Sequence, residues 1–329
     1  MRELEKKYLL NKFKGVGPLF VSRVYTCASM KKERQKLPKS VIVKNTVITG
    51  IVVVTGIAGG LAVGIVLGKM LSTKAYQFDA PIDTALEMDY DALMQRYSDD
   101  QNVDSYKPHE VANISWLKFA NEEHTHSVSR CIVTAAIVKQ KVCSHDVRDG
   151  NRWYSESVFY SAMKKGGFRF YQDEQNVFRY TASNPKEDCT ADWNKETEYG
   201  YTKAEFEEAW GKTLERPVIY VISDQTVKEE TIETKDGNWI IDLELDPAKS
   251  TVRYARQMIS MSNLESPPSF SLVHLTFTVD TNFNLIQLKA HEKYTVYVVG
   301  RNDSESTNVI DYYHNSTETI PDLETDYVY

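Results

Sequence analysis

The segment from Asn45 to Gly68 places the strongest constraint on what this chain can fold into. It contains no charged residue and is bracketed by Lys44 and Lys69. A helix of this length extends about 36 Å, which is enough to cross a hydrocarbon layer of ~30 Å. Because a backbone in lipid must satisfy its own hydrogen bonds, the sequence predicts a single transmembrane helix over residues 45–68.

The charges on either side of this segment predict its orientation. Residues 1–44 carry twelve Lys and Arg against three Glu, a formal charge of +9, whereas the whole chain has −7. By the positive-inside rule the N-terminus lies in the cytoplasm and the acidic remainder lies outside the cell membrane. We expect the basic arm to contact anionic lipid headgroups and not nucleic acid.

Glycines recur at every fourth position of the same segment, at Gly56, Gly60, Gly64 and Gly68. They form a groove along one side of a helix, where a second membrane helix can approach closely. We therefore expect homo- or hetero-oligomers through this helix, with a plain anchor rich in small residues as the alternative. A cleaved signal peptide is a third interpretation, which the long basic lead and the long apolar run disfavour.

Composition divides the chain into five parts. A basic cytoplasmic arm (1–44) and the transmembrane helix (45–68) are followed by an acidic stalk (69–107), an extracytoplasmic domain (108–318) and an acidic tail (319–329). The domain is large enough for a single hydrophobic core.

Strand patterns with a period of two dominate the domain. Helices are expected from His109 to Glu122, following Pro108, after the capping box of Thr202 and Glu205, and after Asp246-Pro247. Eight or so mostly consecutive strands with two or three helices on one side predict an α+β fold built on an antiparallel sheet. The candidate strands are residues 127–142, 151–160, 167–172, 176–182, 217–222, 226–234, 239–245, 270–280, 285–299 and 306–313.

Part of this pattern resembles a known class of proteins. The residues concerned are Tyr220-Val-Ile, Thr226-Val, the helix with RYARQM at 253–258, and the long strand pair at 268–296. Over about 110–318 the chain resembles extracytoplasmic proteins and lipoproteins of Gram-positive bacteria with the LolA/LppX-like fold. The resemblance implies a curved half-barrel sheet closed over by helices, with space for a hydrophobic ligand. This chain departs from that class because a membrane helix takes the place of a lipidated cysteine.

Three of the four cysteines lie in the part expected outside the membrane, where disulfides form. Three cysteines allow one disulfide, either Cys143–Cys189 or Cys131–Cys143, and their spacing does not decide between the two pairings. Cys27 lies in the cytoplasmic arm and is expected as a free thiol.

One carboxylate breaks the alternation of its strand. Glu292 falls on the same side as Leu288, Ala290, Tyr294 and Val296, the side assigned to the interior. A buried carboxylate needs a cation, a hydrogen-bond network or a cavity. An ion pair with Arg253 or Arg256, a bend that turns Glu292 outward, and a polar group inside a ligand cavity are the three interpretations.

Signatures of catalysis are missing from the sequence. It contains no GxSxG, HExxH, P-loop, GxGxxG or calcium-loop motif, and no Cys/His spacing typical of a metal site. The sequence therefore predicts no enzyme, no cofactor and no metal. The first function expected is binding of a hydrophobic or cell-envelope ligand by a membrane-anchored domain. The alternative is a scaffolding subunit of a cell-envelope complex.

Overall fold

A computed structural model describes residues 84–321 except 136–137, 162–164, 195–198, 212, 262–263, 265 and 298–300. The predicted anchor with its four glycines, the basic arm, most of the stalk and the end of the acidic tail lie outside the described residues. Among the residues that are described, no helix is both long and apolar enough to cross a membrane.

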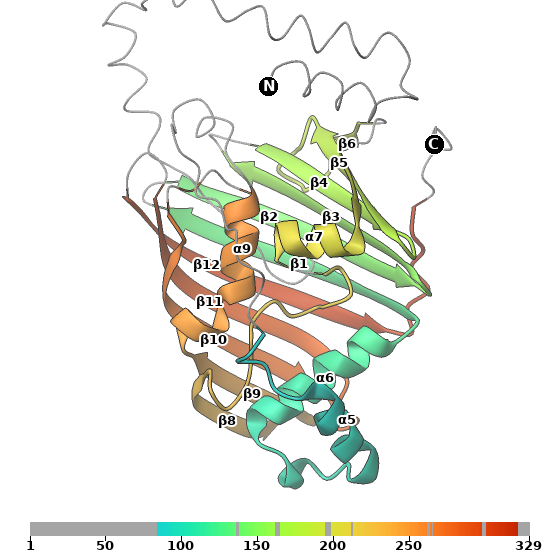
Figure 1. The fold of residues 1–329 in the computed structure, drawn as a ribbon, viewed down its shortest axis with the longest axis vertical. Coiled ribbons are helices and arrows are strands. Elements are labelled where there is room, and N and C mark those ends of the chain that lie inside the picture. Colours follow the sequence, from blue (N-terminus) through green and yellow to red (C-terminus); the bar gives the residue numbers. More distant parts are fainter. Residues whose placement is uncertain are drawn as a thin grey trace, which may run out of the picture. The chain divides into compact units, whose positions relative to one another are not determined.

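The described residues form one antiparallel sheet of twelve strands (Figure 1). Its spatial order is β6-β5-β4-β3-β2-β1-β12-β11-β10-β9-β8, with β7 paired to β5. From β1 to β6 and from β8 to β12 consecutive strands are neighbours, and β12 returns to pair with β1 and joins the two halves of the sheet. The strands are β1 (His124–Ala135), β2 (Val138–Asp149), β3 (Arg152–Ser161), β4 (Lys165–Gln172), β5 (Asn176–Ser183), β6 (Asp192–Trp193), β7 (Tyr199–Thr202), β8 (Val227–Lys235), β9 (Asn238–Leu245), β10 (Ser269–Val279), β11 (Leu285–Tyr297) and β12 (Arg301–His314).

The helices lie on one face of this sheet, which we call the inner face (Figure 1). This arrangement confirms the predicted α+β class with a curved antiparallel sheet. The helices are α5 (Tyr90–Asp99), the 3-10 helix η1 (Val103–Ser105), α6 (Pro108–Asn121), α7 (Lys203–Trp210), α8 (Pro247–Ser250) and α9 (Val252–Met261).

Local signals explain where these helices begin and end. Pro108 occupies the first turn of α6, and Thr202 with Glu205 forms the expected capping box of α7. The Asp246 side chain accepts a hydrogen bond from the Ala248 N–H at the start of α8. Helix α7 ends at Gly211, whose φ of 68° suits glycine, and a Cβ there would lie 2.4 Å from the Arg253 carbonyl oxygen of α9. Glycine thus permits the close contact between α7 and α9.

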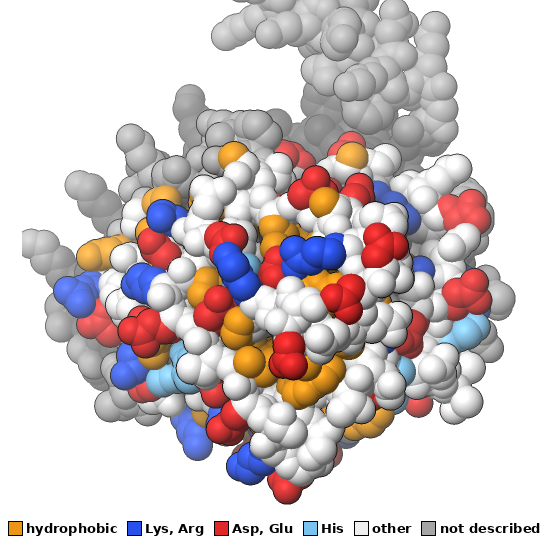
Figure 2. All heavy atoms as spheres, turned by 90° about the horizontal axis from the view of Figure 1, so that it is seen from below, with side chains coloured by type: hydrophobic (Ala, Val, Ile, Leu, Met, Phe, Trp, Pro, Cys, Tyr) orange, Lys and Arg blue, Asp and Glu red, His pale blue; other side chains and the backbone are white. Residues whose placement is uncertain are grey.

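The main hydrophobic core lies between α6 and the inner face of β9 to β12. Leu93 of α5 and Tyr106 belong to this core, so the part of the acidic segment that the structure describes contacts the domain. The end of the molecule that carries α5 and α6 shows hydrophobic side chains at its centre, surrounded by interspersed acidic and basic ones (Figure 2).

Two of the expected strands are wrong. Residues 127–142 contain two strands, β1 and β2, because a hairpin divides the run. Residues 217–222 form no strand but an irregular buried segment. This segment is apolar because it is buried on all sides, and its backbone bonds to other groups: Ile222 O accepts from Asn113, and Val221 N donates to Ser250 O.

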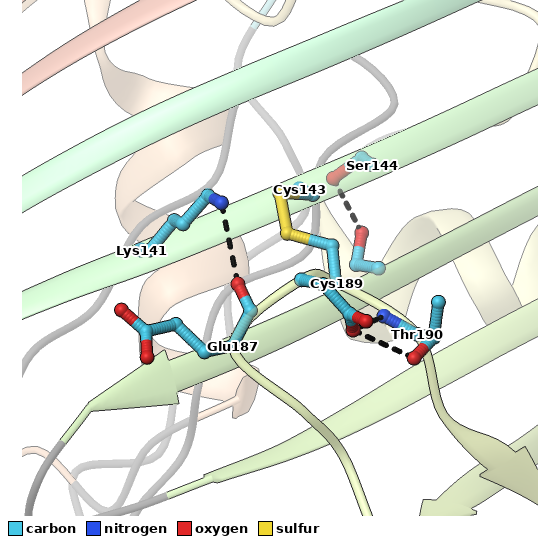
Figure 3. The surroundings of a disulfide bond; sticks show 8 residues. Lys141, Cys143, Ser144, Glu187, Cys189 and Thr190 are labelled. Carbon is cyan, nitrogen blue, oxygen red and sulfur yellow. Dashed lines mark hydrogen bonds between the residues drawn. A yellow bond between two sulfur atoms is a disulfide. The ribbon is translucent and has the colours of Figure 1, made fainter.

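A disulfide joins Cys143 on β2 to Cys189 in the loop after β5, across 46 residues of chain (Figure 3). Next to it, Lys141 donates a hydrogen bond to the Glu187 carbonyl oxygen. Cys131 is a free, buried thiol on the neighbouring strand β1. Of the two pairings that the sequence allowed, the structure therefore contains the one between Cys143 and Cys189.

Candidate functional site

A strip of small polar side chains runs along the inner face in the middle of the sheet. The strand register places Ser129, Ser144 and Ser157 side by side, and Ser127 lies next to Asp146. We call these residues the polar strip, and all of them except Asp146 are less than a tenth exposed. The polar strip consists of Thr125, Ser127, Ser129, Gln140, Ser144, Asp146, Ser155, Ser157, Ser161, Glu292, Ser304, Ser306 and Asn308.

Apolar clusters border the polar strip on both sides. On one side lies the main core of β9 to β12. On the other side, Phe206 and Trp210 of α7 pack on Phe170 of β4, with ring centroids 5.2 and 5.6 Å from that of Phe170. A small apolar cluster that includes Val133, Val142 and Phe159 lies within the strip. The inner surface therefore combines hydrogen-bonding groups with apolar side chains, which is the usual composition of a ligand site.

Glu292 is the buried acid at one edge of this strip. Its side chain has no exposed surface and accepts hydrogen bonds from three hydroxyl groups. Ser306 Oγ lies 2.6 Å from Glu292 Oε2, and Tyr254 of α9 donates over 3.3 Å to the same oxygen. The hydroxyl of Tyr220, from the irregular buried segment, donates to Oε1. One strand, one helix and one connecting segment thus converge on this carboxyl.

Burial sets the protonation of this centre. Loss of hydration raises the pKa of Glu292 to about 7, and the bonds from Ser306, Tyr220 and Tyr254 oppose that rise without cancelling it. Burial and the nearby Glu292 carboxyl raise the pKa of the Tyr220 phenol and of the Cys131 thiol well above their usual values. Near neutral pH the centre therefore holds protonated hydroxyl and thiol groups around a carboxyl that gains or loses one proton.

The ion pair of Glu292 with Arg253 or Arg256, one of the three interpretations, is not present among the contacts of the described residues. Arg253 is bonded to Glu87 at 2.8 Å and to Glu207 at 3.0 Å, and Arg256 to Glu208 at 2.6 Å. These glutamates lie on α7 and on the segment before α5, so the arginines tie the covering segments together. Both arginines thus pair with these glutamates, whereas the contacts of Glu292 described above come from hydroxyl groups.

Several buried polar atoms of the polar strip and of α9 have no hydrogen-bond partner within the described residues. Both side-chain polar atoms of Asn308 on β12 are in this state, as are both of Gln257, one helical turn after Tyr254 on α9. The Ser304 hydroxyl and the side-chain amide oxygen of Gln140 are two further examples. Unpaired groups of this kind are unusual because buried polar groups in folded proteins are almost always paired.

A small pocket lies at the far end of the polar strip. Its volume is about 20 Å³, roughly the space of one water molecule. Thr125, Ser127 and Asp146 of the strip line it together with Arg148, and apolar side chains complete the wall. The apolar members are Phe119, Val147, Trp153, Leu214 and Pro217, with His126 beside them.

Sequence reasoning found Glu292 because a carboxylate interrupted an apolar alternation, but it missed the serines. In β1 the apolar Val128 and Ile132 face outward while Ser127 and Ser129 face inward. Only the pairing of β1 with β12 and β2 fixes that register. Across the described residues there is no group of three or more side chains suited to hold a metal ion.

The chain has little similarity to known proteins. No protein-family model matches the chain, and no curated protein is significantly similar to it. Among solved structures, a DUF1329 family protein from Desulfovibrio piger is similar to 64% of this chain and 93% of its own, with 12% sequence identity and a TM-score of 0.25. A TM-score this low carries no argument about function, so the LolA/LppX-like class stays a prediction.

Proposed function

We propose that this protein is a membrane-anchored, extracytoplasmic binding domain whose polar strip receives part of an amphipathic ligand. The observation that carries the proposal is the set of buried amide and hydroxyl groups on the polar strip and on α9 that have no partner within the described residues. The ligand class is a hydrophobic or cell-envelope molecule with hydrogen-bonding groups. The protein acts by binding, not by catalysis.

Buried polar groups without partners destabilise the folded protein. A buried polar group without a partner costs about 1–3 kcal/mol, and one amide side chain carries both a donor and an acceptor. If this region were only structural, its unpaired polar groups would raise the free energy of the folded state. These groups belong to Asn308, Gln257, Gln140 and Ser304. A ligand that supplies donors and acceptors recovers that cost, and its apolar part fits the walls that border the strip.

Two features support the location outside the membrane. The charge asymmetry around residues 45–68 favours an external domain. The disulfide between Cys143 and Cys189 is typical of proteins in oxidising compartments.

Native mass spectrometry of the full-length protein in mild detergent tests the proposal. We expect a non-protein adduct of defined mass on the wild-type chain. Ser129→Phe fills the strip and should remove the adduct, whereas Arg130→Phe, the next residue along but on the outer face, should retain it.

Two results would count against binding. One is the absence of any adduct from several expression hosts, and the other is an adduct that both variants retain equally. If, instead, a second membrane protein co-purifies and is lost in Gly60→Ile with Gly64→Ile, the scaffolding alternative is favoured.

A further inference from the structure

A row of aromatic rings crosses the outer face of the sheet, opposite the polar strip. The rings lie on six neighbouring strands, and each contacts the next one along the row. Their centroids are separated by 4.1 Å at the stacked end, between Tyr313 and His126, and by up to 6.4 Å, between His145 and Tyr154. We call Tyr313, His126, His145, Tyr154, Tyr171 and Tyr180 the aromatic row.

A cation holds one end of this row in place. The guanidinium group of Arg169 lies 5.5 Å from the ring centroid of Tyr171, 5.2 Å from that of Tyr180 and 5.1 Å from that of Trp193. Cation–π contacts of this kind orient rings before anything binds to them. Tyr154 is 2% exposed even though it lies on the outer face of the sheet.

The chain's own C-terminal segment lies on the aromatic row. After β12 the backbone N–H of Ser316 donates to the His124 carbonyl oxygen over 2.9 Å, and the Ser316 hydroxyl is 2.8 Å from His126 Nδ1. Farther along, Ile320 packs against the cluster formed by Tyr154, Tyr171, Tyr180 and Val147. The segment thus uses one hydroxyl contact and one aliphatic side chain, four residues apart.

Charge is complementary between the two surfaces. Residues 315–329 contain Glu318, Asp322, Glu324 and Asp326 and no basic residue. The outward-facing positions of β1, β2 and β4 carry the basic residues Arg130, Lys139, Lys141, Lys165 and Arg169, which outnumber the acidic Asp149 and Glu156 on the same face of β2 and β3. An acidic segment is therefore attracted to this face independently of its apolar contact.

We propose that the aromatic row is a binding site for an acidic, extended peptide segment with an aliphatic side chain, and that the C-terminal segment occupies it within the same chain. The site is separate from the polar strip and faces the other way. An occupant from the same chain competes at a high effective concentration, so a segment of another protein binds only when the C-terminal segment is displaced.

The test uses full-length protein and a fluorescent synthetic peptide of residues 315–329, with binding followed by anisotropy. Ile320→Asp in the protein removes the aliphatic contact of the C-terminal segment but leaves the site intact. We expect this variant to bind the peptide at least tenfold more tightly than the wild-type protein does. Thr319→Asp, which adds the same charge at an exposed neighbouring position, should bind like the wild type.

Two further measurements make the result decisive. A peptide that carries Ile320→Asp should bind none of the proteins, because it lacks the side chain that enters the cluster. Arg169→Glu in the Ile320→Asp protein should weaken binding of the normal peptide at least tenfold while the circular dichroism spectrum stays unchanged. Equal binding by the wild-type and Ile320→Asp proteins, or equal binding of both peptides, would overturn the proposal.

Discussion

The inner faces of β9 to β11 and of β1 to β3 are buried to a similar extent but carry different side chains. The first carries Leu243, Leu275 and Phe277, each with no exposed surface. The second carries a small apolar cluster that includes Val133, Val142 and Phe159, but also Ser129, Ser144 and Ser157, each at most 3% exposed. Burial of these apolar side chains stabilises the fold, whereas burial of serines contributes little hydrophobic free energy. The apolar half, β9 to β11, should therefore contribute more to the stability of the fold than the polar half, β1 to β3.

Truncation of one residue in each half should give the largest difference in the free energy of unfolding. Leu275→Ala removes packed methyl groups from the apolar half, and we expect it to lower the free energy of unfolding by about 2–5 kcal/mol. Ser144→Ala removes a hydroxyl bonded to Ser157 over 2.7 Å and should cost no more than about 1 kcal/mol. Urea denaturation measures both. Equal losses would show that the two halves contribute alike to stability.

The disulfide should matter most for the polar half, which it joins to the loop after β5. Cys143→Ser with Cys189→Ser opens a closure of 46 residues, for which chain entropy predicts a loss of about 4 kcal/mol, within a usual range of ~2–5 kcal/mol. Hydrogen exchange should accelerate in β2 to β5 before it does in β9 to β11. Uniform acceleration through the whole sheet would contradict a division into two halves.

The sequence predicts the apolar half better than the polar one, for a physical reason. Alternating aliphatic residues in β9, β10 and β11 identify both the strands and their buried side. In the first part of β1 the same rule points the wrong way, because Val128 faces outward between Ser127 and Ser129, which face inward. Caps at Pro108, Thr202 and Asp246 predicted three helix starts from purely local chemistry.

The sequence does not predict the contacts between segments that are far apart in the chain. The hydroxyl groups that hold Glu292 come from Tyr220, Tyr254 and Ser306, which are brought together only by the fold. The glutamate partners of Arg253 likewise lie 166 and 46 residues away along the chain. For this reason an ion pair was one of the interpretations of Glu292, where the structure has a hydroxyl network.

Glu292, at the border between the halves, should give stability a distinctive pH dependence. Its folded pKa of about 7 exceeds the usual 4.5, so the folded state keeps a proton that the unfolded state has lost. This contribution is fully present below pH ~4.5 and is lost as pH rises through ~7, a change of about 3 kcal/mol. The difference in unfolding free energy between wild type and Glu292→Gln should therefore fall by that amount from pH 4.5 to pH 8. A constant difference would show that the carboxyl ionises normally.

The smallest effect on stability is expected at Asn308. Because its buried amide has no partner within the described residues, Asn308→Leu should leave the protein as stable as before or stabilise it by about 1 kcal/mol. The same change should reduce the ligand adduct seen by native mass spectrometry. A loss of stability above ~2 kcal/mol would mean that Asn308 has a structural role.

Photo-crosslinking inside intact cells tests the central claim most directly. A diazirine-bearing amino acid is placed at Ser144, which faces the polar strip, and separately at His145, which faces outward on the same strand. After irradiation we expect a small-molecule adduct of one defined mass at position 144 and none of that mass at position 145. Adducts at neither position, or equal adducts at both, would contradict a ligand site on the inner face.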